Sequence, residues 1–171
     1  MKQALQILLA FVLLVPAQAL IFNHLALFNV AIPLVFLYII VMLPVTLGTN
    51  LSTTIGFLAG LTLDMFCDTA GVNTVSCTML AFARKPIFHL YMSTDDDLAG
   101  RSPSVHSMGH GAFMKYLITF VLAYCSIMFT IEAFQFFNFR LLVLRIIASS
   151  AYSFILIYAL DCAVSRRRAT T

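Results

Sequence analysis

Long apolar stretches separated by short polar ones dominate the pattern of residues along the chain. A helix that spans a membrane needs about 20 mainly apolar residues. The apolar stretches predict helices at about residues 4–22, 27–47, 52–66, 72–91, 113–137 and 141–164. Because open sheet edges cannot face lipid, we expect an all-α integral membrane protein with about six transmembrane helices. These helices form a single transmembrane domain, residues 1–171.

Two parts of this pattern have a second interpretation. The first segment contains Pro16-Ala17-Gln18-Ala19, which resembles a signal-peptide cleavage site, but apolar residues continue to Phe22 and favour a retained helix. The third segment is short, and Arg84-Lys85-Pro86 interrupts the fourth. These two segments form either two spans, with the basic side chains reaching the interface, or a re-entrant hairpin. Both alternatives return the chain to the same side.

The composition excludes a soluble globular domain. Of the 171 residues, 61% are hydrophobic and 10% are charged, and the mean hydropathy is +0.98. Soluble chains are about 45–50% apolar and about 25% charged, so this chain has too few polar residues to cover a water-exposed surface. A net charge of +3 is too small for a nucleic-acid-binding surface.

The distribution of basic residues predicts the orientation in the membrane. With six helices, both termini lie on one side, which also receives Lys2, Arg84, Lys85, Arg101, Lys115 and Arg166–Arg168. Arg140 is the one basic residue in the opposite loops. Because cytoplasmic loops are rich in Lys and Arg, we expect both termini and the polar loop at residues 92–112 to be cytoplasmic.

This polar loop has three interpretations. It is either a solvated connector or a docking surface that presents Asp95, Asp96, Asp97 and Arg101. A metal site formed by the aspartates with His106 and His110 is the third, but Gly109 and Gly111 oppose the helix that would align both imidazoles. The sequence also lacks the GxSxG, HExxH and P-loop motifs, and we expect no enzyme, cofactor or metal.

Small and acidic residues recur every four positions in the third segment, at Ser52, Gly56, Gly60 and Asp64. Residues at this spacing share one face of a helix, and small residues let helices approach closely in lipid. The row predicts a packing face, either within this chain or toward another membrane protein. An acidic residue such as Asp64 usually faces the bundle interior and has a function, and helix capping is the alternative.

Glu132 and Arg145 are charged residues within the last two segments. The short turn near residues 137–140 makes these segments antiparallel neighbours, and the two residues lie equally far from its centre. Because unpaired charges are costly in lipid, we expect an intramembrane ion pair. The alternative is that both side chains reach the outer interface.

Residues Gly56–Phe82, GFLAGLTLDMFCDTAGVNTVSCTMLAF, resemble the MreD family of bacterial rod-shape-determining proteins. That family commonly has a helix of the form G-x-x-x-G-L-x-x-D, a short glycine-containing turn and an apolar helix. The matching positions here are Gly56, Gly60, Leu61, Asp64 and Gly71. The length, the six segments and the prolines of the second segment also agree, and the polar DDD loop resembles members from the Bacteroidota.

The resemblance implies a non-enzymatic scaffold in the bacterial inner membrane that regulates cell shape and lateral peptidoglycan synthesis. Its partners would be membrane lipids, an MreB-like filament, an MreC-like scaffold and a RodA-type glycosyltransferase with its penicillin-binding transpeptidase. The family is similar in fold to the S components of energy-coupling-factor transporters, so a membrane-embedded, vitamin-type binding subunit is the alternative. Such a binder needs convergent polar groups, and the sequence offers few in its outer loops, which favours the scaffold.

Overall fold

The computed structural model describes residues 2–22, 32–92, 103–133 and 139–168, which are helical over most of their length and contain no strands. Helix α1 continues into a π-helix, η1, and the other helices follow in chain order. Their bounds are α1 Lys2–Ala17, η1 Gln18–Phe22, α2 Leu37–Val41, α3 Thr49–Cys67, α4 Val72–His89, α5 Val105–Met108, α6 His110–Ala133 and α7 Phe139–Arg168. The all-α class is therefore confirmed for these residues.

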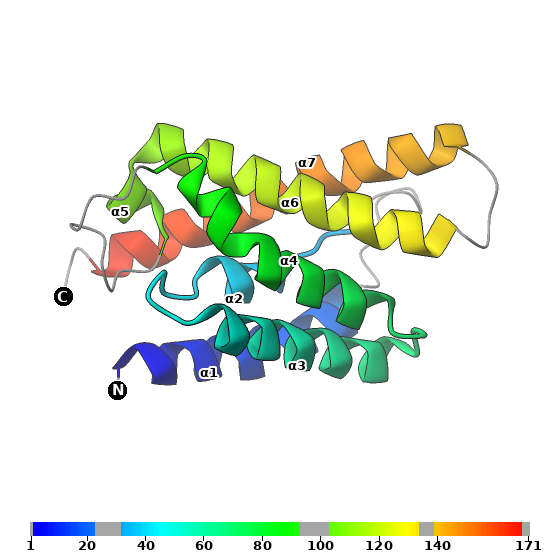
Figure 1. Ribbon diagram of the computed structural model, residues 1–171, viewed down its shortest axis with the longest axis horizontal. Coiled ribbons are helices and arrows are strands. Elements are labelled where there is room, and N and C mark those ends of the chain that lie inside the picture. The colour runs from blue at the N-terminus through cyan, green and yellow to red at the C-terminus, as the bar shows by residue number, and fades with distance from the viewer. Residues whose placement is uncertain (1, 23–31, 93–102, 134–138, 169–171) are drawn as a thin grey trace.

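The long helices run lengthwise through the molecule in alternating directions (Figure 1). Helices α1, α3 and α6 run from the left end of the view to the right, and α4 and α7 run back. Helix α3 packs against α4, and α6 packs against both α4 and α7. Consequently α1 begins and α7 ends at the same end of the molecule.

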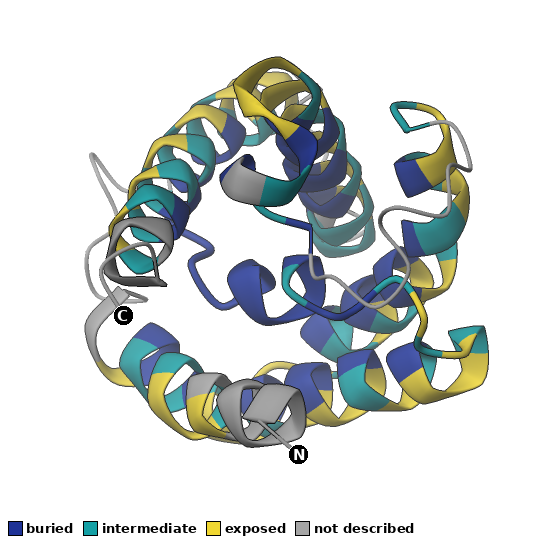
Figure 2. Cartoon of the chain, turned by 90° about the vertical axis from the view of Figure 1, so that its left-hand side faces the viewer, coloured by how far each residue is buried: buried dark blue, intermediate teal, exposed yellow. Residues whose placement is uncertain are grey.

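Residues 32–47 do not form one long helix, so the prediction of a helix at residues 27–47 was wrong for its described part. This part contains only the short α2, and all residues from 33 to 41 are buried. Proline lacks a backbone N–H and disfavours helix at the residue before it, and Pro33 and Pro44 flank α2. Figure 2 shows this part at the centre of the molecule, with the other helices around it. We call residues 32–44 the core segment.

The α3–α4 hairpin turns within a few residues. Asp68 ends α3 with φ at 52°, in the left-handed conformation that Asp adopts more readily than most residues, and its N–H bonds to the carbonyl of Asp64. Gly71 precedes α4 with φ at 81°, which suits glycine. Pro86 lies inside α4 without ending it.

Two helices are long and apolar enough to cross a membrane among the described residues. They are His110–Glu132, with 23 residues, and Arg140–Val164, with 25 residues. By length and composition alone, these two helices give weak support to a membrane location.

Candidate functional site

Asp64 caps the helix that follows its own. Glycine at the N-cap of α4 has no side chain to accept the first free N–H groups, and the Asp64 carboxylate accepts them instead. One oxygen accepts the backbone N–H of Asn73 at 3.1 Å, and the other accepts that of Thr74 at 2.8 Å. Side chains of Thr69, Asn73 and Thr74 donate to the same carboxylate. Asp64 therefore holds five hydrogen bonds while only 6% exposed.

This network extends to a third helix. The hydroxyl of Tyr124, on α6, donates to the Asn73 side-chain oxygen at 2.9 Å, and both residues are buried. The Tyr124 ring also packs edge-on against Phe36 of the core segment, with centroids 5.7 Å apart. The charge of Asp64 is thus used to fix the turn and to join α3, α4 and α6.

Replacing Asp64 with asparagine is expected to lower the free energy of unfolding by about 2–3 kcal/mol. An amide keeps the size but places N–H donors against donors, and each hydrogen bond to a charged group contributes about 1.5–3 kcal/mol. The measurement is unfolding of the purified protein in mixed micelles with increasing sodium dodecyl sulfate. Asp68→Asn is the matched control, because Asp68 is exposed and its side chain has no hydrogen-bond partner among the described residues. Equal stability of the two variants would contradict the capping role.

The row of small residues faces α4. A methyl group at Gly56 would come within 2.6 Å of the Ala81 Cβ, and one at Gly60 within 2.5 Å of the Thr74 Cα. Ser52 is 1% exposed on the same face. Gly56, Gly60 and Asp64 therefore lie at the α3–α4 contact within the chain, and Ser52 is buried one helical turn before them. A role of this row toward another membrane protein stays a prediction.

Side chains from distant helices bind the backbone at the start of the core segment. The Gln18 side chain accepts from the N–H of Val35 at 2.9 Å and donates to the carbonyl of Pro33 at 2.6 Å. On α7, the hydroxyls of Ser149 and Ser153 accept from the N–H groups of Ile32 at 3.1 Å and Leu34 at 2.9 Å. Because buried backbone groups without partners are costly, these three side chains make the irregular backbone tolerable.

Arg84 binds the other end of the core segment. Its guanidinium donates to the carbonyls of Leu43 and Pro44, the latter at 2.7 Å, and the residue is 2% exposed. The alternative in which the Arg84 side chain reaches the interface therefore does not hold here, because the carbonyls of Leu43 and Pro44 bind its guanidinium inside the protein. Its neighbour Lys85 is only partly buried.

Asp161 links the core segment to the polar loop. Its carboxylate accepts from the Tyr38 hydroxyl at 3.1 Å and from the backbone N–H of Val105 at 2.8 Å. Asp161 is 2% exposed, so the end of the polar loop is anchored to α7 and α2. Asp95, Asp96, Asp97 and Arg101 lie outside the described residues, and their docking role stays a prediction.

Glu132 and Arg145 contact each other across the α6–α7 hairpin. The carboxylate and guanidinium are 3.6 Å apart, and each side chain is 42% exposed. Half-exposed pairs in water contribute at most about 1 kcal/mol. The expected role of this pair in fixing how the two helices face each other stays a prediction.

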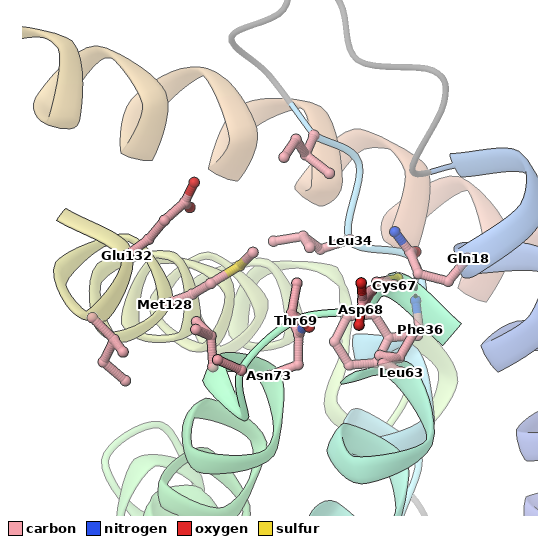
Figure 3. Close-up of a pocket in the computed structure, with 14 residues that line it drawn as sticks. Gln18, Leu34, Phe36, Leu63, Cys67, Asp68, Thr69, Asn73, Met128 and Glu132 are labelled. Atoms are coloured by element: carbon pink, nitrogen blue, oxygen red, sulfur yellow. Dashed lines mark hydrogen bonds between the residues drawn. The ribbon is translucent and has the colours of Figure 1, made fainter. Parts of the chain in front are cut away.

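A cavity of about 400 Å³ lies beside the α3–α4 turn (Figure 3). Its walls come from the turn, the start of the core segment and the end of α6. Apolar side chains lining it include Leu34, Phe36, Leu63, Met128 and Ile131, and the polar ones are Gln18, Asp68, Thr69, Asn73 and Glu132. The described residues contain no cluster of three His, Cys, Asp or Glu side chains placed to hold a metal ion.

The polar residues that bind the core segment were not predicted from the sequence. Gln18, Ser149, Ser153 and Arg84 are isolated polar positions in apolar stretches, and each is less than 4% exposed. The signal was the spacing of Ser149 and Ser153, one helical turn apart on an apolar helix. Their backbone partners could not be identified, because the second segment was predicted to bond to itself as a helix.

The chain was compared with known protein families, curated proteins and solved structures. No family model, curated protein or solved structure matches the chain.

Proposed function

We propose that the protein is a multi-pass scaffold of the bacterial inner membrane, of the MreD type, that serves cell elongation. The observation that carries the proposal is the use of the G-x-x-x-G-L-x-x-D stretch. Gly56 and Gly60 let α3 pack closely against α4, and the Asp64 carboxylate caps the N-terminus of α4. These residues serve the shape of the hairpin, which suits an adaptor that presents helix surfaces to partners.

The outer surface of the hairpin supports insertion in lipid. Large apolar side chains on α3 and α4 are 40–79% exposed, including Phe57, Leu61, Met65, Phe66, Met79 and Phe82. Soluble proteins rarely expose so large an apolar surface. We infer six passes, formed by α1, the core segment, α3, α4, α6 and α7. An irregular second pass is compatible with a membrane because protein surrounds it.

The orientation proposed places both termini in the cytoplasm. The start of α1 and the end of α7 share one end of the molecule. Among the described residues, the helix ends there carry Lys2, Arg84, Lys85, Lys115 and Arg166–Arg168. Alkaline phosphatase, which is active only in the periplasm, is expected to be inactive when fused after Thr171 and active when inserted after Ala70, in the α3–α4 turn. Activity of the fusion after Thr171 would overturn this orientation.

The proposed partners are an MreB-like filament on the cytoplasmic side, an MreC-like scaffold, and a RodA-type glycosyltransferase with its penicillin-binding transpeptidase. In the native bacterium, depletion of the protein is expected to convert rods to spheres and to stop lateral incorporation of fluorescent D-amino acids. Wild-type protein should restore both. Rods of normal width after complete depletion would reject the scaffold function.

A second candidate is a membrane-embedded subunit that binds a small molecule, and the cavity of about 400 Å³ favours it. Ligand sites commonly have volumes of about 300–1,000 Å³ and combine apolar walls with a few polar groups. Depletion would then cause a nutritional requirement without rounding, so one depletion experiment separates the two functions.

A further inference from the structure

Most polar groups that line the cavity are already bonded within the protein. The Gln18 amide uses its oxygen and its nitrogen on the core segment. Thr69 and Asn73 donate to Asp64, and the Asn73 oxygen accepts from Tyr124. These three residues shape the cavity but have little hydrogen-bonding capacity left for a ligand.

The remaining polar groups in the lining are two carboxylates. The side chain of Asp68 has no hydrogen bond or ion pair to any described residue, and its left-handed backbone holds it at the turn beside Cys67 (Figure 3). Glu132 lies on the far side of the cavity and contacts Arg145 at 3.6 Å. No Lys or Arg among the described residues lines the cavity. Arg145 balances the charge of Glu132, so the carboxylate of Asp68 leaves the cavity with a net charge of about −1.

The chemistry of a fitting ligand follows from these walls. An apolar body would displace water from the surfaces of Leu34, Phe36 and Met128. A carboxylate without a cation partner favours a positively charged donor and disfavours an anion.

We propose that this cavity binds a small amphipathic amine, with its ammonium group at Asp68 and its apolar body against Phe36 and Met128. The proposal rests on the second candidate function, that the cavity is a ligand site, and adds the chemical class of the ligand. It does not depend on the scaffold function. The ammonium group could belong to a free amine or to the headgroup of an ethanolamine lipid.

Cys67 reports occupancy, because it lines the cavity and is partly exposed, whereas Cys77 and Cys125 are buried. The protein is purified in dodecyl maltoside and treated with N-ethylmaleimide, and alkylation of Cys67 is followed by peptide mass spectrometry. The probes are 2-phenylethylamine, 2-phenylethanol and 3-phenylpropionate, which are cationic, neutral and anionic. The shift in thermal unfolding temperature with each probe is the second readout, since a ligand of the folded state stabilises it.

We expect the amine to protect Cys67 at about tenfold lower concentration than the alcohol, as one charge-assisted hydrogen bond provides. The anion should not protect. Asparagine suits the left-handed backbone at this position, so Asp68→Asn should lower the protection of Cys67 by the amine to that given by the alcohol. Asp68→Glu should retain part of the preference for the amine. Added phosphatidylethanolamine that displaces the amine, when phosphatidylglycerol does not, identifies the lipid as the natural source; no displacement identifies a free amine.

Two results would overturn the inference in distinguishable ways. Equal protection by amine and alcohol in the wild type, or a preference that survives Asp68→Asn, rejects the amine while leaving the cavity as a ligand site. Absence of both protection and thermal stabilisation with every probe rejects the cavity itself as a binding site for this class.

Discussion

Replacing Arg84 with leucine is expected to lower the free energy of unfolding by about 3 kcal/mol. The substitution leaves the buried carbonyl of Leu43 without its donor, and such an unsatisfied group costs about 1–3 kcal/mol. The carbonyl of Pro44 keeps the N–H of Leu47 but loses a hydrogen bond to a charged group, which contributes about 1.5–3 kcal/mol. Part of this cost is offset because a buried guanidinium no longer has to be desolvated. Unfolding in mixed micelles measures the loss, and protein level in membranes follows it.

Arg84→Lys separates the effect of charge from that of geometry. Lysine keeps the positive charge but lacks the planar fork that reaches two adjacent carbonyls, so we expect it to recover less than half of the lost stability. Lys85→Gln is the control, because this neighbouring basic residue is only partly buried. If Arg84→Leu proves no more harmful than Lys85→Gln, Arg84 does not hold the core segment.

Gly60→Ala is expected to cost about 3 kcal/mol or more. The added Cβ would lie 2.5 Å from the Thr74 Cα and 2.6 Å from the Asn73 carbonyl oxygen, both backbone atoms. Overpacking of this kind typically costs about 1–3 kcal/mol, and moving α4 away also lengthens the hydrogen bonds that Asp64 makes to it. Thermal unfolding in detergent should therefore occur at a clearly lower temperature.

Gly111→Ala provides the matched control for this substitution. Gly111 is also helical, and among the described residues no atom outside its own stretch of helix lies within 4 Å of the position that an added methyl group would take. Alanine there should leave stability unchanged or raise it by about 0.4–1 kcal/mol. Equal effects at the two glycines would show that the α3–α4 contact is not tight.

The helices that bury one face and expose the other could be predicted from the sequence. Residues 52–66 and 72–91 correspond closely to α3 and α4, because apolar length and four-residue spacing are local properties. The row at Ser52, Gly56, Gly60 and Asp64 was recognised as a packing face for the same reason. Glu132 and Arg145 could be paired because only a short turn separates their helices.

The core segment could not be predicted, because its stability comes from residues far away in the chain. An apolar stretch that contains two prolines can form a kinked helix or an irregular buried strand of chain, and local pattern does not separate them. Gln18, Arg84, Ser149 and Ser153 decide between them by bonding to the backbone. The cavity could not be predicted either, because Leu34 and Phe36 of the core segment form part of the cavity wall.

The hydrogen bonds between the core segment and α7 join residues far apart in the sequence, and this separation fixes an order of events during biosynthesis. The N–H groups of Ile32 and Leu34 find their acceptors 117 and 119 residues later in the chain. While the ribosome is still synthesising α6, the start of the core segment therefore lacks two of its acceptors, and burying such N–H groups without partners is costly. Closing such distant contacts is slow. The core segment consequently reaches its described conformation only after α7 has been made, so a chain truncated before Ser149 is expected to leave this segment without its fold.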